Sequence, residues 1–123
     1  MSRRIASISN LLEVIENGTI TVTNVQRKTK AFADVTETDN VEPEKFVESI
    51  QYLNEATLFR DGIDFFYEFT DENNIRIECG MKNAYLDEYF YANCVIKNGV
   101  TVTDVETKLR KTIFGKMDEK IAV

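Results

Sequence analysis

Acidic side chains are the residues of this chain whose chemistry could be catalytic. The chain has no histidine, so the commonest general base and metal ligand of proteins is missing. Carboxylates at Asp61, Asp64, Glu68 and Glu78 lie on or near a predicted β-hairpin, and carboxylate oxygens are the ligands that Mg²⁺ prefers. A metal-dependent enzyme, or a small-ligand binding protein, that uses these carboxylates is therefore one hypothesis.

The neighbours of these carboxylates favour the alternative, which is ordinary exposed charge on a strand. A nuclease site built on Asp71 and Glu78 would need a lysine beside the second acid, and Cys79 and Gly80 stand there instead. The sequence has no glycine-rich phosphate loop, no Ser-His-Asp set and no paired CxxC motif. Cys79 and Cys94 lack a metal-ligand spacing, and we expect two reduced thiols in strands. We therefore expect no enzyme, no bound metal and no cofactor.

Negative charge is concentrated in the middle of the chain. The formal net charge is -6, and the segment from Asp34 to Glu72 alone holds 12 acidic and two basic residues. The other residues hold nine acidic and 13 basic side chains, so the ends are mildly basic. A negative field repels nucleic acid and attracts basic partners, so we expect no direct binding of nucleic acid. The alternative is a solvated acidic face that only keeps the protein soluble.

Two groups of residues could form a protein-binding surface. The first is acidic and belongs to a predicted helix and to the turn and strand that follow it. The second contains tyrosines, which interfaces favour because a large ring with a polar tip loses little entropy on binding. The candidate partner-binding residues are Glu42, Glu44, Glu48, Glu55, Asp61, Asp64, Tyr85, Asp87, Glu88, Tyr89 and Tyr91. The alternative for the tyrosines is that they complete a core that lacks tryptophan.

The favoured function is a non-enzymatic regulator or inhibitor that presents this acidic, aromatic-flanked surface to another protein. In one version the partner is a nucleic-acid-binding protein with a basic surface, and the acids imitate the phosphate backbone. Small acidic anti-defence proteins of phages and mobile elements provide the analogy. This hypothesis predicts that charge reversal at Glu44, Glu48 and Glu55 weakens binding and reduces its sensitivity to salt. A homodimeric assembly protein that pairs through a strand edge is the third hypothesis.

Length and composition predict one cytoplasmic domain over residues 1–123. The apolar fraction of 43% and the charged fraction of 29% are those of a globular protein. No apolar run reaches the 18 or so residues that a membrane span needs, so we expect no membrane contact. Ser7 and Ser9 interrupt the segment that follows Arg3 and Arg4, which is not the pattern of a secretory signal.

The hydrophobic periodicity predicts an α+β fold, with three helices packed on a mainly antiparallel sheet of four to six strands. We expect helices over 4–16, 43–57 and 104–118. We expect strands over 20–22, 28–35, 63–70, 75–81, 90–96 and 100–102, with a loop at 36–41, although 24–28 could begin a helix instead. A shared apolar face in the hairpin requires Phe69 opposite Ile75, which sets Glu68 opposite Arg76.

Two segments, 14–28 and 95–108, share one pattern. Each contains Val-Ile-x-Asn-Gly, then alternating threonine and aliphatic residues. Asn-Gly predicts a turn because both residues tolerate positive φ. We expect a turn, a short strand and a helix cap in each segment, with Thr23 and Thr103 as the caps. An internal duplication is one hypothesis, and independent use of the same common residues is the other.

Overall fold

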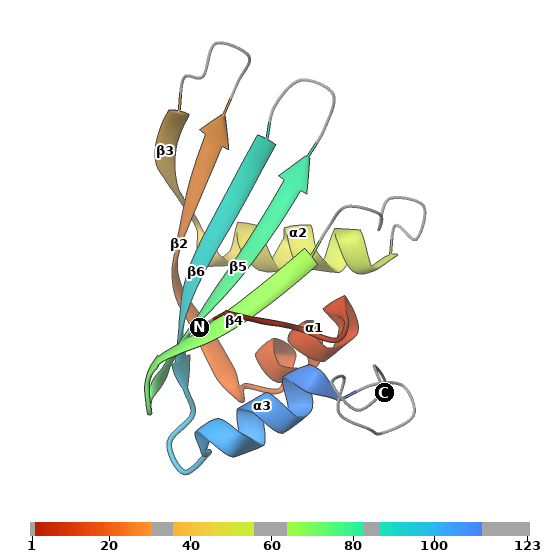
Figure 1. Cartoon of the computed structure of the whole chain (residues 1–123), viewed down its shortest axis with the longest axis vertical. Helices are drawn as coiled ribbons and strands as arrows, with labels where there is room; N and C mark the ends of the chain where they lie inside the picture. The colour runs from red at the N-terminus through yellow and green to blue at the C-terminus, as the bar shows by residue number, and fades with distance from the viewer. Residues whose placement is uncertain (1, 31–35, 56–63, 83–86, 112–123) are drawn as a thin grey trace.

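The computed structural model describes residues 2–30, 36–55, 64–82 and 87–111 (Figure 1). Three helices lie in these ranges: α1 (Ile8–Glu16), α2 (Pro43–Glu55) and α3 (Val102–Arg110). Six strands lie there as well: β1 (Arg3–Arg4), β2 (Ile20–Lys30), β3 (Thr36–Val41), β4 (Asp64–Asp71), β5 (Asn74–Lys82) and β6 (Asp87–Ile96). The strands form one antiparallel sheet in the order β1-β4-β5-β6-β2-β3. The predicted α+β class is confirmed.

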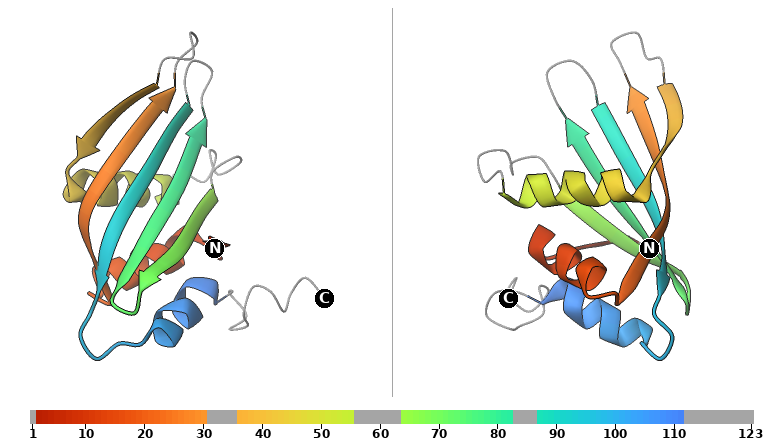
Figure 2. Two further views of the ribbon diagram at one scale, coloured as in Figure 1. Left: turned by 60° about the vertical axis from the view of Figure 1, so that its left-hand side comes forward. Right: turned by 180° about the vertical axis from the view of Figure 1, so that it is seen from behind.

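The three helices lie on one face of the curved sheet, and no described helix covers the other face (Figure 2). Because side chains alternate along a strand, every second residue faces the helices and the others face outward. On β6, for example, Phe90, Ala92 and Cys94 are buried, whereas Asn93 and Val95 are exposed. We call the two sides of the sheet the helix face and the open face.

The core lies between the helix face and the helices. Ile50 of α2, Ile77 of β5 and Leu109 of α3 have no exposed surface. The hydroxyl of Tyr67 on β4 donates a hydrogen bond of 2.8 Å to Glu106 of α3. Burial and this hydrogen bond raise the pKa of Tyr67, so the hydroxyl remains the donor at neutral pH and ties α3 to the sheet.

Helix α2 begins as the sequence predicts. Pro43 stands in the first turn, where its missing N–H has no intrahelical partner to lose, and Glu44 follows it near the positive end of the helix dipole. Phe46 and Ile50 point inward and are buried. The predicted helix over 43–57 is confirmed to Glu55, and residues 56 and 57 lie outside the described part.

The predicted register of the β4–β5 hairpin is confirmed. Phe69 pairs with Ile75 and Glu68 pairs with Arg76. A bulge after Phe69 precedes the turn, in which the carboxylate of Asp71 accepts a hydrogen bond of 2.7 Å from the Asn73 N–H. The alternation of apolar residues therefore fixed both the register and the face that each strand buries.

The segments on either side of residues 31–35 differ from the prediction. Residues 24–28 continue strand β2 and start no helix. Residues 36–41, predicted as a loop, form the edge strand β3, which pairs with β2 from Val25↔Val41 to Lys30↔Thr36. Backbone pairing holds this strand although its sequence is polar, and residues 31–35 lie outside the described part.

The outer helices also begin at other residues than predicted. The segment before α1 contains strand β1 on β4, and the Ser7 hydroxyl caps α1 by accepting a hydrogen bond of 3.2 Å from the Asn10 N–H. Helix α3 begins at Val102, so the predicted strand over 100–102 is wrong. It ends at Arg110, and residues 112–118 of the predicted helix lie outside the described part.

The two Asn-Gly turns lie side by side. Gly18 and Gly99 have φ values of 80° and 88°, and the N–H of Lys97 donates a hydrogen bond of 2.9 Å to the carbonyl oxygen of Thr19. A strand follows the first turn and a helix follows the second. The duplication stays a hypothesis, because the turns agree while the elements after them differ.

Both predicted caps in these segments are wrong. Thr23 lies within strand β2, where its hydroxyl donates a hydrogen bond of 3.0 Å to the carbonyl oxygen of Asn93. The cap of α3 is Thr101 rather than Thr103, because the Thr101 hydroxyl accepts a hydrogen bond from the Asp104 N–H and the Asp104 carboxylate accepts one from the Thr101 N–H, each at 3.1 Å. Thr101 and Asp104 thus form the reciprocal capping box.

Candidate protein-binding surface

One solvent-facing stripe of α2 carries three acids and a tyrosine. The members recur at helical spacing and fall within about a quarter of the helix circumference. They are Glu44, Glu48, Tyr52 and Glu55, and all four are exposed. We call this set the α2 stripe. Tyr52 has 66% of its surface exposed, the larger value of the two large hydrophobic residues that are exposed in the described part of the chain.

The acids of the α2 stripe do not stabilise the fold by ion pairing within the described residues. No ion pair there involves Glu44, Glu48 or Glu55. Glu44 and Glu48 are four residues apart on one helix side, and like charges at this spacing destabilise a helix by a few tenths of a kcal/mol. The negative charge of the stripe is therefore available to a partner.

Two grooves of the described structure flank the α2 stripe. The larger has a volume of about 540 Å³ and lies between α2 and strands β3, β2 and β6; its lining is Arg27, Val41, Lys45, Glu48, Ser49, Tyr52, Leu53, Glu88 and Phe90. The smaller has a volume of about 370 Å³ and lies between α2, α1 and the start of β2; its lining is Ile15, Ile20, Thr21, Val22, Pro43, Glu44, Val47 and Glu48. Glu48 lines both grooves, so the α2 stripe forms the ridge between them.

An internal ion pair neutralises the arginine of the larger groove. The Arg27 guanidinium donates hydrogen bonds to both carboxylate oxygens of Asp39, at 3.1 and 2.6 Å. These bonds raise the pKa of Arg27 and lower the pKa of Asp39. Since Asp39 already neutralises Arg27, the charge of Arg27 does not cancel the field of the α2 stripe, and Lys45 is the other cation in the lining of this groove.

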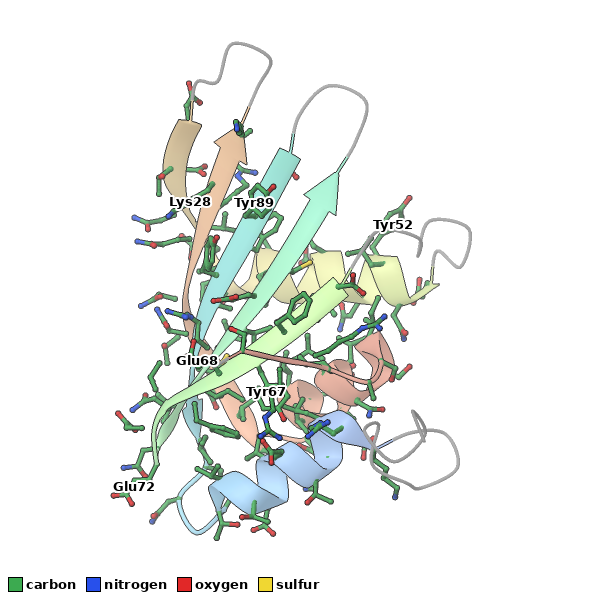
Figure 3. The ribbon with its side chains drawn as sticks, in the orientation of Figure 1. Lys28, Tyr52, Tyr67, Glu68, Glu72 and Tyr89 are labelled. Carbon is green, nitrogen blue, oxygen red and sulfur yellow. The ribbon has the colours of Figure 1, made fainter. Side chains whose placement is uncertain are left out.

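The predicted group around the tyrosines is divided, because its two described tyrosines lie on one face of the sheet and Glu88 lies on the other. Tyr89 and Tyr91 of β6 lie on the open face, whereas Glu88 lies on the helix face and lines the larger groove. The ring of Tyr89 covers Gly80, where a Cβ would lie 3.5 Å from two ring atoms. The Nζ atom of Lys28 stands 5.3 Å from the centroid of Tyr91. Figure 3 labels Tyr89 on β6 and Tyr52 on α2, which come from opposite layers of the molecule.

Arginines hold three of the hairpin carboxylates that the alternative hypothesis of a metal site would use. Arg76 Nη2 lies 2.7 Å from Glu68 Oε2 and 3.0 Å from Glu78 Oε1. Arg4 Nη2 lies 3.0 Å from Asp64 Oδ1. Among the described residues no group of three histidine, cysteine, aspartate or glutamate side chains is placed to hold a metal ion.

The structure therefore brings together only part of the predicted surface. Glu44, Glu48 and Glu55 share one stripe, and Glu42 directly precedes α2, where its carbonyl oxygen accepts hydrogen bonds from the first turn. Of the predicted tyrosines, Tyr89 and Tyr91 are described, and both lie on the open face of the sheet, away from α2. Asp61 and Tyr85 lie outside the described residues, and of Asp87 only the backbone is described, paired with Lys30 and Lys82.

Tyr52 is the candidate residue that the sequence analysis missed. It follows Glu48 by four positions and precedes Glu55 by three, so a helical projection of the predicted helix places it on the acidic side. The tyrosine that accompanies the acids thus comes from α2 itself.

No described helix is long and apolar enough to cross a membrane. Cys79 and Cys94 are both free and buried.

In comparisons with known proteins, no family model, no curated protein and no solved structure matches the chain.

Proposed function

We propose that this chain is a non-enzymatic regulator or inhibitor that binds a basic surface of another protein through the α2 stripe. Two features of the α2 stripe together carry the proposal. Its three acids form no ion pair within the described residues, and Tyr52 is exposed on the same side of the helix. Tyrosines that anchor in a pocket, surrounded by charges that steer the approach, are typical of protein interfaces.

The charge of the partner follows from the charge of the stripe. Glu44, Glu48 and Glu55 favour lysine and arginine side chains, and a protein that binds nucleic acid carries such a surface. Imitation of the phosphate backbone is thus one version of the proposal, with the anti-defence proteins of phages and mobile elements as the analogy. Tyr52 fits this version as well, because a tyrosine ring offers a face to an arginine.

A pair of charge-matched variants tests the proposal. The first variant replaces Glu44, Glu48 and Glu55 with lysine, and the control replaces Glu13, Glu16 and Glu72, which are exposed on α1 and on the β4–β5 turn. Each substitution changes the charge by two, so three of them take both proteins from -6 to 0. The tagged wild type and both variants are used to capture proteins from an extract of the source cells.

The expected result is a protein that the wild type and the control retain and the α2 variant loses. With that protein purified, titration calorimetry should show binding at least about tenfold weaker for the α2 variant, since three charge pairs of about 0.5 kcal/mol each are removed and reversed. Binding by the wild type should weaken with salt more steeply than binding by the variant. Equal affinity for all three proteins would contradict the proposal.

A further inference from the structure

Strand β2 has an uncovered edge over its first half. It pairs with β6 from Ile20 to Lys30, but it pairs with β3 only from Val25 to Lys30. Among the described strands none lies against residues 20–24 on the side opposite β6. The left view of Figure 2 shows β3 ending partway along β2, so that β2 itself forms the border of the sheet below that point.

The main-chain groups at this border follow from the pairing with β6. The Lys97 N–H donates to the Thr19 carbonyl oxygen at 2.9 Å, and Thr21 pairs with Val95 two residues further. In an antiparallel ladder the residues alternate between the two neighbouring strands. The N–H and C=O groups of Ile20 and Val22 therefore point away from β6, toward the uncovered edge.

The smaller groove beside α2 opens at the same place. Its walls include apolar side chains of α1, β2 and α2, and the carboxylates of Glu44 and Glu48. The side chains of Ile20 and Val22 point to the helix face. A residue of an added strand that lay opposite them would point to the helix face too, toward Val47. Main-chain partners, an apolar recess and two acids thus meet at one site.

We propose that an extended segment of the partner protein adds to β2 at residues 20–24 as a further strand. One of its apolar side chains would occupy the smaller groove, and a lysine or arginine two residues along the segment, whose side chain points to the same face, would meet Glu44 and Glu48. The added backbone would satisfy the groups of Ile20 and Val22, which is the hydrogen bonding that gives strand addition its affinity. This inference rests on the proposed function and specifies how the basic partner is held.

The charges favour a basic segment over a second copy of this chain. Residues 20–24, Ile-Thr-Val-Thr-Asn, contain no basic side chain. Pairing of two copies through this edge would bring Glu44 and Glu48 of both copies together without a cation from either strand. Like charges at short distance oppose such pairing.

Short synthetic peptides test the inference on the whole protein. Blocked peptides in which every second residue is in turn valine or leucine and lysine, with threonine between them, place the apolar and the basic side chains on one face. They are titrated to millimolar concentration into the ¹⁵N-labelled chain. The control peptides replace lysine with glutamate, or carry N-methyl groups that remove the ladder donors while keeping charge and side chains. The readouts are amide chemical shifts and hydrogen exchange.

The expected result is saturable shifts at residues 20–24, 44, 47 and 48. The amide protons of Ile20 and Val22 should gain protection from exchange, whereas that of Thr21, already directed at β6, should not. Lysine at positions 44 and 48 should weaken binding by about tenfold or more. The N-methylated and the acidic peptides should not bind. Val22→Pro, which removes the edge N–H together with the Val22 side chain of the groove, should lower the affinity, and circular dichroism verifies its fold.

Four outcomes would overturn the inference. Shifts confined to Glu48, Tyr52 and Glu55 would mean that basic peptides bind the α2 stripe without adding a strand, and the proposed function would stand. Equal binding of the N-methylated peptide would exclude the ladder. The absence of saturable shifts, or a dimer by light scattering that buries residues 20–24, would exclude the site, while the capture experiment with the α2 variant would still decide the proposed function.

Discussion

The acids of the open face form ion pairs within the protein, whereas the acids of the α2 stripe form none within the described residues. On the open face, Glu68 and Glu78 share one guanidinium, that of Arg76, and their side chains are 30% and 26% exposed. On α2, Glu44 and Glu48 are exposed, repel each other along the helix and form no ion pair within the described residues. The first group helps to set the register of a hairpin, whereas the repulsion between Glu44 and Glu48 opposes the stabilisation that Glu44 gives at the start of α2.

The difference indicates which charge is free to act on another molecule. A carboxylate that is paired with an arginine must give up that ion pair when it binds another molecule. An acid of the α2 stripe has no ion pair within the described residues to give up. The tyrosines differ in the same way, since Tyr91 contacts Lys28 and Tyr52 is largely exposed. Four predictions test whether this comparison holds.

The largest effect should come from removing the shared cation of the open face. Arg76→Met leaves Glu68 and Glu78 half-buried without their guanidinium, and we expect the free energy of unfolding to fall by about 1–2 kcal/mol at pH 7. Urea denaturation followed by circular dichroism measures it. The matched change on α2, Lys45→Met, should stay within about 0.5 kcal/mol. Equal losses would remove the distinction between the two regions.

The two tyrosines should separate stability from binding. Tyr91→Ala removes a half-buried ring and its contact with Lys28, so we expect a loss of about 1 kcal/mol in unfolding free energy. Tyr52→Ala should change stability by less than about 0.5 kcal/mol, yet weaken binding to the captured partner by about tenfold, as for an interface anchor. Thermal denaturation and calorimetry measure the two effects. A destabilising Tyr52→Ala would place that ring in the fold rather than in the interface.

Acid should destabilise the protein through carboxylates that the fold holds. Hydrogen bonds from Asn73 lower the pKa of Asp71, and hydrogen bonds from Thr101 lower the pKa of Asp104. A lowered folded-state pKa gives stability that is present above the ordinary value of about 4 and is lost as the pH falls through the folded pKa. Urea midpoints between pH 7 and pH 3 should therefore decline.

The decline with acid should depend in part on these two carboxyl groups. Asp71→Asn combined with Asp104→Asn should reduce the pH dependence, because two of the carboxyl groups with a lowered pKa are then gone. A decline as steep as that of the wild type would show that these two groups do not contribute to it.

The smallest effect should have opposite signs in the two regions. Glu48→Gln removes the repulsion with Glu44, so we expect the free energy of unfolding to rise by about 0.3 kcal/mol. Glu68→Gln removes a carboxylate from Arg76 and should lower it by a similar or larger amount. Chemical denaturation of both variants at low salt, where these interactions are least screened, measures the difference.

The sequence predicts those parts of the fold that local patterns determine. Pro43 and the buried spacing of Phe46 and Ile50 predict α2, and the alternation around Phe69 and Ile75 predicts the hairpin register. Strand β3 could not be predicted in this way, because its polar residues form a strand only where β2 offers a paired backbone. The start of α3 was misplaced because Thr101 and Thr103 are each followed three residues later by an acid. Asp104 forms the capping box with Thr101, whereas Glu106 accepts a hydrogen bond from Tyr67 of the distant strand β4.

The same division applies to the candidate site. Helical spacing places Glu44, Glu48 and Glu55 on one stripe, and it would have included Tyr52. The face of Tyr89 and Tyr91 depends on which side of the sheet the helices cover, which is a contact between distant segments. The smaller groove likewise depends on β3 ending at Val41, a boundary that the local pattern does not contain.

Chemical modification of the two buried thiols can report how often the centre of the sheet opens. Cys79 and Cys94 stand on the neighbouring strands β5 and β6, and burial raises the pKa of each thiol to about 12. Only the thiolate attacks a labelling reagent, so the closed protein should resist modification even at pH 8. Modification must then proceed through molecules in which these strands have separated. Its rate would follow the population of that open form in native buffer, without denaturant.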